Sequence, residues 1–127
     1  MKLYIVRHGT TDWNVQCRFQ GRIDIELNSN GRMLAGKLGE KLENVHFDCI
    51  YSSPLSRAYE TANLIRGHRN IQIIKNDLLA EIAFGELEGC LSDDFLNTDN
   101  PRKYFFTEQK KYVPPKGGES FEQLCQR

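Results

Sequence analysis

The sequence lacks several features that would indicate a particular class of protein. It has no excess of charge of one sign, because 17 lysines and arginines balance 17 aspartates and glutamates. This balance argues against a nucleic-acid-binding surface. The first apolar run is too short for a membrane span or for the core of a signal peptide. We therefore expect a cytoplasmic protein that binds neither nucleic acid nor membrane.

Cysteine and histidine are sparse and scattered. The four cysteines contain no Cys-x-x-Cys pair, and the three histidines lie far apart in the chain. This spacing favours reduced thiols over disulfides and does not match a metal-binding motif. No internal repeat is present, and 127 residues suit one ordinary domain. We expect a single domain over residues 1–127, with no metal and no other cofactor.

The sequence does contain short apolar runs that alternate with amphipathic segments. Leu3-Tyr4-Ile5-Val6 is β-branched and too short for a helix, which is typical of a strand buried on both faces. Residues 47–52 and 71–74 predict two further strands. Residues 29–45 and 53–65 have apolar side chains at helical spacing. The pattern predicts an α/β fold of three layers, with a mostly parallel central sheet and helices on both faces.

Both expected helices carry start signals. Asn28 or Ser29 suits the N-cap of the first helix. Ser53 suits the N-cap of the second, with Pro54 at its first position, where the missing N–H costs nothing. Three glycines are expected to weaken the first helix somewhat, namely Gly31, Gly36 and Gly39.

Polar residues follow the first two expected strands, at the ends where open α/β sheets bind ligands. Arg7, His8 and Gly9 follow the first strand. Arg57 lies in the first turn of the second helix, where the helix dipole already places partial positive charge. It is either a surface arginine paired with Glu60, or it binds an anion together with the helix N-terminus. We favour the anion, because it would remove the electrostatic conflict.

The motif around these residues resembles the opening of the histidine phosphatase superfamily, whose members include the cofactor-dependent phosphoglycerate mutases. The matching residues are Arg7-His8-Gly9-Thr10-Thr11, Trp13-Asn14 and Arg18-Phe19-Gln20-Gly21, in the family's order and spacing. Residues 52–58 match the segment with the family's second phosphate-binding arginine, and residues 79–89 match the segment with its general acid. Residues 117–120 match the family's segment before a helix, which Ser120 would cap.

The resemblance implies a binding site for a phosphoryl group. His8 would be the nucleophile, Arg7 and Arg57 would hold phosphoryl oxygens, and Glu81 would be the general acid. Glu81 lies among apolar residues, and burial would favour its protonated form. The residues alone also allow a capping or surface glutamate, and it is the resemblance that implies the role of general acid. The further residues expected to bind the phosphate are Gly9, Thr11, Asn14, Gln20 and Gly21, with backbone N–H groups contributing at the two glycines.

The implied function is that of a metal-independent phosphomonoesterase that acts on small phosphorylated metabolites through a phosphohistidine at His8. The expected partners are such a metabolite or inorganic phosphate. One alternative is a phosphoglycerate mutase, although the arginine pair of those relatives is not found here. Another is a non-catalytic fragment that binds phosphate. We interpret the aromatic and basic residues 101–112 as a helical insertion beside the pocket.

The resemblance also implies a later strand that ends in a second histidine, and neither is present in this sequence. His46 and His68 do not replace that histidine, because both lie elsewhere in the pattern. We therefore expect an incomplete domain without the family's C-terminal strand, and the absence of the second histidine counts against activity of this chain. The first strand would lose a neighbour, and an open sheet edge invites pairing with another chain. A homo-oligomer is compatible with this expectation.

Overall fold

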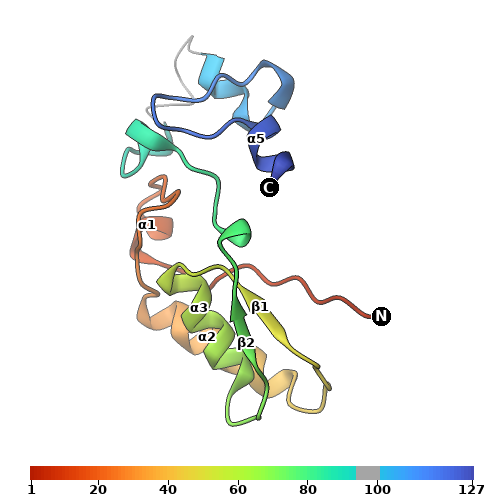
Figure 1. The fold of residues 1–127 in the computed structure, drawn as a ribbon. Coiled ribbons are helices and arrows are strands. Elements are labelled where there is room, and N and C mark those ends of the chain that lie inside the picture. The colour runs from red at the N-terminus through yellow and green to blue at the C-terminus, as the bar shows by residue number, and fades with distance from the viewer. Residues whose placement is uncertain (94–100) are drawn as a thin grey trace. The chain divides into compact units, whose positions relative to one another are not determined.

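The computed structural model describes residues 1–93 and 101–127. The chain divides into two compact units, which comprise residues 1–12 with 24–80 and residues 13–23 with 81–127. Parallel strands and helices make this a mixed α/β fold, as predicted (Figure 1). Within the described residues, no helix has the length and apolar character needed to cross a membrane.

The first unit contains a parallel sheet of two strands. β1 (Ile50–Ser52) and β2 (Ile73–Lys75) pair in register, with Tyr51 opposite Ile74. β1 lies inside the predicted run 47–52, and β2 overlaps the predicted run 71–74. Each strand has three residues, which form three pairs. The prediction of two neighbouring parallel strands is therefore confirmed, with shifted ends.

One helix packs against this sheet, and a second packs against that helix. α2 (Ser29–Lys41) and α3 (Ser56–Arg66) lie side by side, and α3 also packs against both strands (Figure 1). A Cβ atom at Gly39 of α2 would lie 2.6 Å from the carbonyl oxygen of Leu64 in α3. This glycine, which lowers helix propensity, is therefore what lets the two helices approach closely.

The two helix starts differ in how well local sequence predicts them. Asn28 caps α2 as predicted, because its Oδ1 accepts a hydrogen bond from the N–H of Gly31 at 2.8 Å. The predicted cap at Ser53 is wrong, since α3 begins at Ser56. The N–H and the hydroxyl of Ser56 each donate to the carboxylate of Asp24 at 2.7 Å. The group that caps α3 thus comes from 32 residues upstream.

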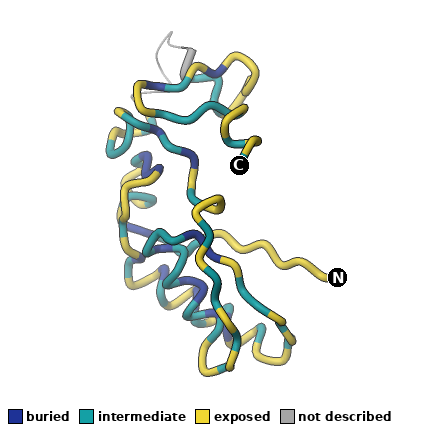
Figure 2. The backbone as a smooth tube through the Cα atoms, viewed as in Figure 1, coloured by how far each residue is buried: buried dark blue, intermediate teal, exposed yellow. Residues whose placement is uncertain are grey.

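The N-terminal apolar segment does not form the predicted strand. Leu3 and Ile5 are 76% and 87% exposed, and Figure 2 shows this end of the chain as an exposed trace. Within the described residues the only sheet consists of β1 and β2, so the segment has no adjacent strand to complete its hydrogen bonds. Its contacts include an edge-on packing of Tyr4 against Phe47, with ring centroids 5.2 Å apart. Burial on both faces needs neighbours that this structure does not supply.

The second unit is built mainly from turns of 3-10 helix. Residues 17–19 run antiparallel to residues 89–92, with a bridge between Arg18 and Leu91. The Gly89 N–H donates to the carbonyl of Phe19 at 2.8 Å. An apolar cluster fills the interior of the unit, and it comprises Phe19, Ile82 and Phe84 with the partly buried Leu87, Phe105 and Leu124.

The remaining helical elements are short. α1 (Asp12–Val15) and η1 (Asp77–Leu79) lie near the points where the chain passes from one unit to the other, and η2 (Gly85–Leu87) belongs to the second unit. The predicted helical insertion takes the form of two 3-10 turns, η3 (Pro101–Phe105) and η4 (Gln109–Lys111).

The last helix, α5 (Phe121–Gln126), begins as the sequence predicts. The Ser120 hydroxyl accepts a hydrogen bond from the Gln123 N–H at 3.1 Å. The Gln123 side chain accepts one in return from the Ser120 N–H at 2.8 Å. This capping box satisfies two backbone donors that would otherwise lack a partner inside the helix. The prediction of a serine cap here is confirmed.

Candidate active site

His8 lies in the loop that follows the N-terminal segment, and it is half-buried. Its Nδ1 is 2.7 Å from the carbonyl oxygen of Gly9. Because a carbonyl oxygen only accepts hydrogen bonds, Nδ1 carries the proton and donates it. In the neutral imidazole the lone pair then resides on Nε2. The loop therefore defines which ring nitrogen of His8 can act as a nucleophile.

Arg57 is buried in the first turn of α3, where only 1% of the residue is exposed. The alternative of a surface arginine is wrong, because Arg57 is buried. Glu60 bonds Arg32, with Arg32 Nε 2.6 Å from Glu60 Oε1. A guanidinium is costly to bury unless its charge is compensated. The burial of Arg57 at the start of α3 agrees with the predicted anion-binding role, and that role remains a prediction.

Thr61 connects the His8 loop to the turn that carries Arg57. Its hydroxyl accepts a hydrogen bond from the Gly9 N–H at 3.0 Å and donates one to the Arg57 carbonyl at 2.7 Å. The Gly9 N–H was expected to bind phosphate, and the structure instead directs this donor to Thr61. Local sequence does not indicate Thr61, because its partner Gly9 lies 52 residues upstream. Its spacing of four residues from Arg57 was the one available signal.

The same loop lies against the start of α2. The Asn28 N–H donates to the carbonyl of Thr10 at 3.0 Å. A Cβ atom at Gly31 would lie 2.7 Å from the Thr10 nitrogen and closer still to the Thr10 oxygen, and one at Gly9 would lie 2.7 Å from the Gly31 oxygen. Only residues without a side chain permit this backbone contact.

Two other predicted phosphate ligands belong to the same unit and differ in exposure. Arg7 is exposed, as is the segment that precedes it. Thr11 is fully buried.

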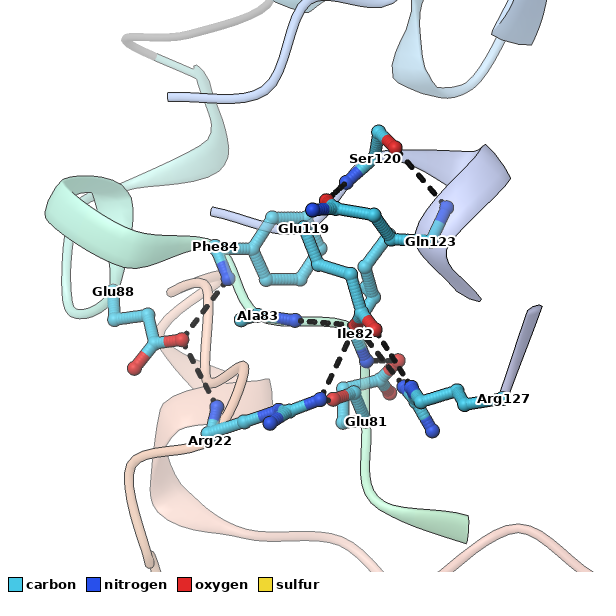
Figure 3. Close-up of polar contacts among 10 residues, drawn as sticks. All are labelled: Arg22, Glu81, Ile82, Ala83, Phe84, Glu88, Glu119, Ser120, Gln123 and Arg127. Carbon is cyan, nitrogen blue, oxygen red and sulfur yellow. Dashed lines mark hydrogen bonds and ion pairs between the residues drawn. The ribbon is translucent and has the colours of Figure 1, made fainter. Parts of the chain in front are cut away.

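The second unit holds Gly21 in a tight contact with Glu88. Glu88 Oε1 accepts hydrogen bonds from the N–H groups of Arg22 and Phe84, each at 3.0 Å (Figure 3). Gly21 has a φ angle of 50°, and a Cβ atom there would lie 2.6 Å from the Glu88 carboxyl carbon. The φ angle therefore favours glycine here, and a side chain at this position would also force the Glu88 carboxylate to shift. Gln20 is buried, whereas Asn14 in α1 is half-buried.

Glu81 is exposed, so of the two alternatives that the sequence left open the surface glutamate is the one observed, and burial does not hold. The segment is extended, and successive side chains of an extended chain point in opposite directions. Ile82 therefore enters the core at 3% exposure while Glu81 turns away from it. Glu81 Oε1 accepts a hydrogen bond from the Ile82 N–H at 2.9 Å, and the Glu81 carbonyl accepts one from Arg22 Nε at 3.3 Å.

Glu119, which precedes α5, forms hydrogen bonds with the extended segment that contains Glu81 and Ala83 (Figure 3). Its N–H donates to the carbonyl of Ala83 at 2.8 Å, and its carboxylate accepts from the Ala83 N–H at 3.3 Å. Arg127 Nε lies 2.7 Å from the carboxylate, and Arg22 contacts it at 3.4 Å. The hydrogen bond from Arg127 is the main reason that the pKa of Glu119 lies below its ordinary value, against an opposing effect of burial.

This pKa shift makes a prediction about acid stability. A lowered folded-state pKa stabilises the fold above the unfolded pKa, which is about 4.3, and this contribution is lost as pH falls through the folded value. Glu119→Gln should therefore lower the free energy of unfolding at pH 7, and the deficit should shrink below about pH 4. Urea unfolding at both pH values measures it, with the exposed Glu122→Gln as control. A deficit independent of pH would contradict the assignment.

Candidate metal ligands do not gather in either unit. Within residues 1–93 and 101–127, no three His, Cys, Asp or Glu side chains are grouped so as to hold a metal ion. The four cysteines are free thiols, and Cys17, Cys90 and Cys125 are exposed.

Comparison with known proteins gives the family. Residues 3–127 match the histidine phosphatase superfamily (branch 1). Phosphoserine phosphatase 1 of Hydrogenobacter thermophilus is 35% identical over 127 residues, which is 100% of this chain and 60% of the relative. A 2,3-bisphosphoglycerate-dependent phosphoglycerate mutase of Cytophaga hutchinsonii is 35% identical over 127 residues, which is 98% of this chain and 60% of the relative.

A solved structure extends this likeness to the fold. Bacillus stearothermophilus YhfR superimposes with a TM-score of 0.86 at 40% identity, over 94% of this chain and 59% of that chain. The chain thus spans about 60% of the length of the relatives described here. Its Arg-His-Gly loop, its parallel sheet and these matches agree, and the chain belongs to the histidine phosphatase superfamily.

Proposed function

We propose that this chain carries the nucleophile and phosphate-binding part of a phosphomonoesterase that acts on small phosphorylated metabolites. The observation that carries the proposal is the hydrogen bond from His8 Nδ1 to the Gly9 carbonyl. It leaves Nε2 with the lone pair that attack on phosphorus requires. The same loop is linked through Thr61 to the turn that carries the buried Arg57.

In the first step, Nε2 of His8 attacks the phosphorus of the monoester. A P–N bond forms as the bond from phosphorus to the ester oxygen breaks, and the bond's electron pair leaves with that oxygen. Arg7 and Arg57 bind the phosphoryl oxygens, where their fixed positive charges stabilise the transition state without a metal ion. Glu81, in its protonated form, donates a proton to the leaving alkoxide.

In the second step, water attacks the phosphohistidine. Glu81, now a carboxylate, accepts a proton from this water as the new P–O bond forms. The P–N bond breaks, and inorganic phosphate leaves with His8 restored. Thr11, Asn14, Gln20 and Gly21 complete the proposed set of phosphate ligands.

A mutase is the second candidate, because a phosphoglycerate mutase is among the similar proteins. It would share the first step and then return the phosphoryl group to a hydroxyl of phosphoglycerate rather than to water. A non-catalytic fragment that binds phosphate is the third candidate. The three candidates differ in what accepts the phosphoryl group. The acceptor is water for the phosphatase and a hydroxyl of phosphoglycerate for the mutase, and the binding fragment transfers no phosphoryl group.

The test measures hydrolysis of para-nitrophenyl phosphate by this chain in the presence of a chelator. His8→Ala should reduce the rate to that of buffer alone, because no other group can form the covalent intermediate. His68→Ala is the matched control, since His68 is exposed and should leave the rate unchanged. Acid-labile phosphate on the protein should appear during turnover and be absent from the His8 variant.

Each other result favours a different candidate. Phosphoprotein that transfers its label only to added phosphoglycerate would favour the mutase. Phosphate binding without a labile phosphoprotein would overturn the catalytic proposal and favour the binding fragment. Equal hydrolysis by the wild type and the His8 variant would exclude His8 as the nucleophile.

A further inference from the structure

We propose that Thr61 is a positioning residue, whose hydroxyl holds the His8 loop in register with Arg57 so that both can engage one phosphoryl group. The inference rests on the proposed function, because it names a residue that serves the same site. Thr61 is not expected to touch the substrate, and it would act through Gly9 and Arg57.

The first support is the way one hydroxyl joins two distant parts of the chain. The Gly9 N–H, 52 residues upstream, donates to Thr61 Oγ1 at 3.0 Å. Thr61 Oγ1 donates in turn to the Arg57 carbonyl at 2.7 Å. A threonine hydroxyl can bond the carbonyl four residues earlier in many helices, so the second bond alone would carry little meaning. The bond from Gly9 is what extends this common contact to the active-site loop.

The second support is the state of Gly9, which is anchored through both of its backbone groups. Its N–H bonds Thr61, and its carbonyl accepts the Nδ1 proton of His8. A continuous path of hydrogen bonds therefore runs from the His8 ring through Gly9 and Thr61 to the backbone of Arg57. A shift of the Gly9 backbone would alter the bond that sets the tautomer of His8.

The third support is burial. Thr61 is 5% exposed and Arg57 is 1% exposed, so water cannot readily replace a lost bond between them. Removing the hydroxyl would leave the part-buried Gly9 N–H without this partner, and it would leave the Thr61 side of the contact buried and unable to accept a hydrogen bond, which is costly. The loop should relieve this cost by moving, which would separate the nucleophile from the phosphate-binding arginine.

The experiment compares Thr61→Ser, which keeps the hydroxyl, with Thr61→Val, which keeps the shape but neither donates nor accepts. Thr61→Ala also removes the hydroxyl and avoids placing a new methyl group beside the Gly9 N–H. Thr107→Val, on the surface, is the control. NMR measures three quantities in the full chain, namely hydrogen exchange of the Gly9 amide, the tautomer of His8 from its ring nitrogen shifts, and the affinity for inorganic phosphate.

We expect Thr61→Ser to stay within about twofold of the wild type in every quantity, because both hydrogen bonds can re-form. Thr61→Val and Thr61→Ala should speed exchange of the Gly9 amide by about tenfold or more, as expected for a protecting bond that is lost. They should also increase the Nδ1-unprotonated tautomer of His8 and weaken phosphate binding by about tenfold, the effect of losing one well-made contact.

Two results would overturn the proposal. The first is unchanged Gly9 exchange, His8 tautomer and phosphate affinity in a folded variant that lacks the hydroxyl. The second is damage in Thr61→Ser equal to that in Thr61→Val, which would show that keeping the hydroxyl does not keep the loop in place. If the wild type itself fails to bind phosphate, the proposed function of this chain fails, and Gly9 exchange with the His8 tautomer still decides whether Thr61 positions the loop.

Discussion

Replacing Arg57 with methionine is expected to weaken binding of inorganic phosphate by about 10²-fold or more, the effect of removing a buried charged donor from an anion site. Methionine keeps much of the arginine stem's volume, so the loss reports the guanidinium rather than a cavity. Arg57→Lys should recover only part of the affinity, because an ammonium group cannot bind two oxygens as the planar guanidinium does. Isothermal titration with phosphate measures these affinities.

The matched control is Arg66→Met, at the opposite end of the same helix. It should bind phosphate as the wild type does. Circular dichroism must show that each variant keeps its helix content. If folded Arg57→Met binds phosphate with unchanged affinity, Arg57 is a structural residue and the anion site lies elsewhere.

Replacing Gly31 with alanine is expected to destabilise the fold by about 2 kcal/mol or more, as overpacking against a rigid backbone does. The new methyl group would lie 2.7 Å from the Thr10 nitrogen and closer to its oxygen, and neither atom can move without shifting the His8 loop. Because His8 lies in that loop and would move with it, phosphate binding should fall together with stability. Urea unfolding followed by circular dichroism measures the change.

The same helix supplies an opposite control. Gly36 has nothing within 4 Å of the position that a Cβ would take, so Gly36→Ala should raise stability by up to about 1 kcal/mol through helix propensity alone. Both substitutions add the same methyl group to α2, and their difference isolates the contact with Thr10. Equal effects at the two positions would contradict the close packing described here.

Local sequence predicted those features whose physical cause is also local. Asn28 and Ser120 cap the helices that follow them, because each side chain bonds an N–H three residues away. The parallel pair of β1 and β2 follows from two apolar runs separated by a helix. The Arg-His-Gly loop predicted the family, since several matches at fixed spacing are specific.

Features that depend on distant residues were not predictable from local sequence. Asp24 caps α3 from another part of the chain, so Ser53 gave a misleading signal. Leu3–Val6 has the composition of a buried strand, but burial needs neighbours, and here the segment is exposed. Glu81 has apolar neighbours, yet alternation along an extended segment turns it away from the core. Thr61 matters only because Gly9 folds back onto it.

The interleaved composition of the two units bears on how the chain folds during synthesis. All residues of the first unit have emerged from the ribosome once residue 80 is outside. The helices and strands of this unit can then contact one another. The second unit can form only after residues 81–127 have been synthesised, although its residues 13–23 emerge much earlier. The Phe19 carbonyl bonds the Gly89 N–H, and the Phe19 ring packs on Phe84. At roughly 5–20 residues per second, Phe19 spends several seconds without its partners. Contacts over so long a stretch of chain form slowly, and the early apolar residues are open to chaperones and to aggregation throughout that interval.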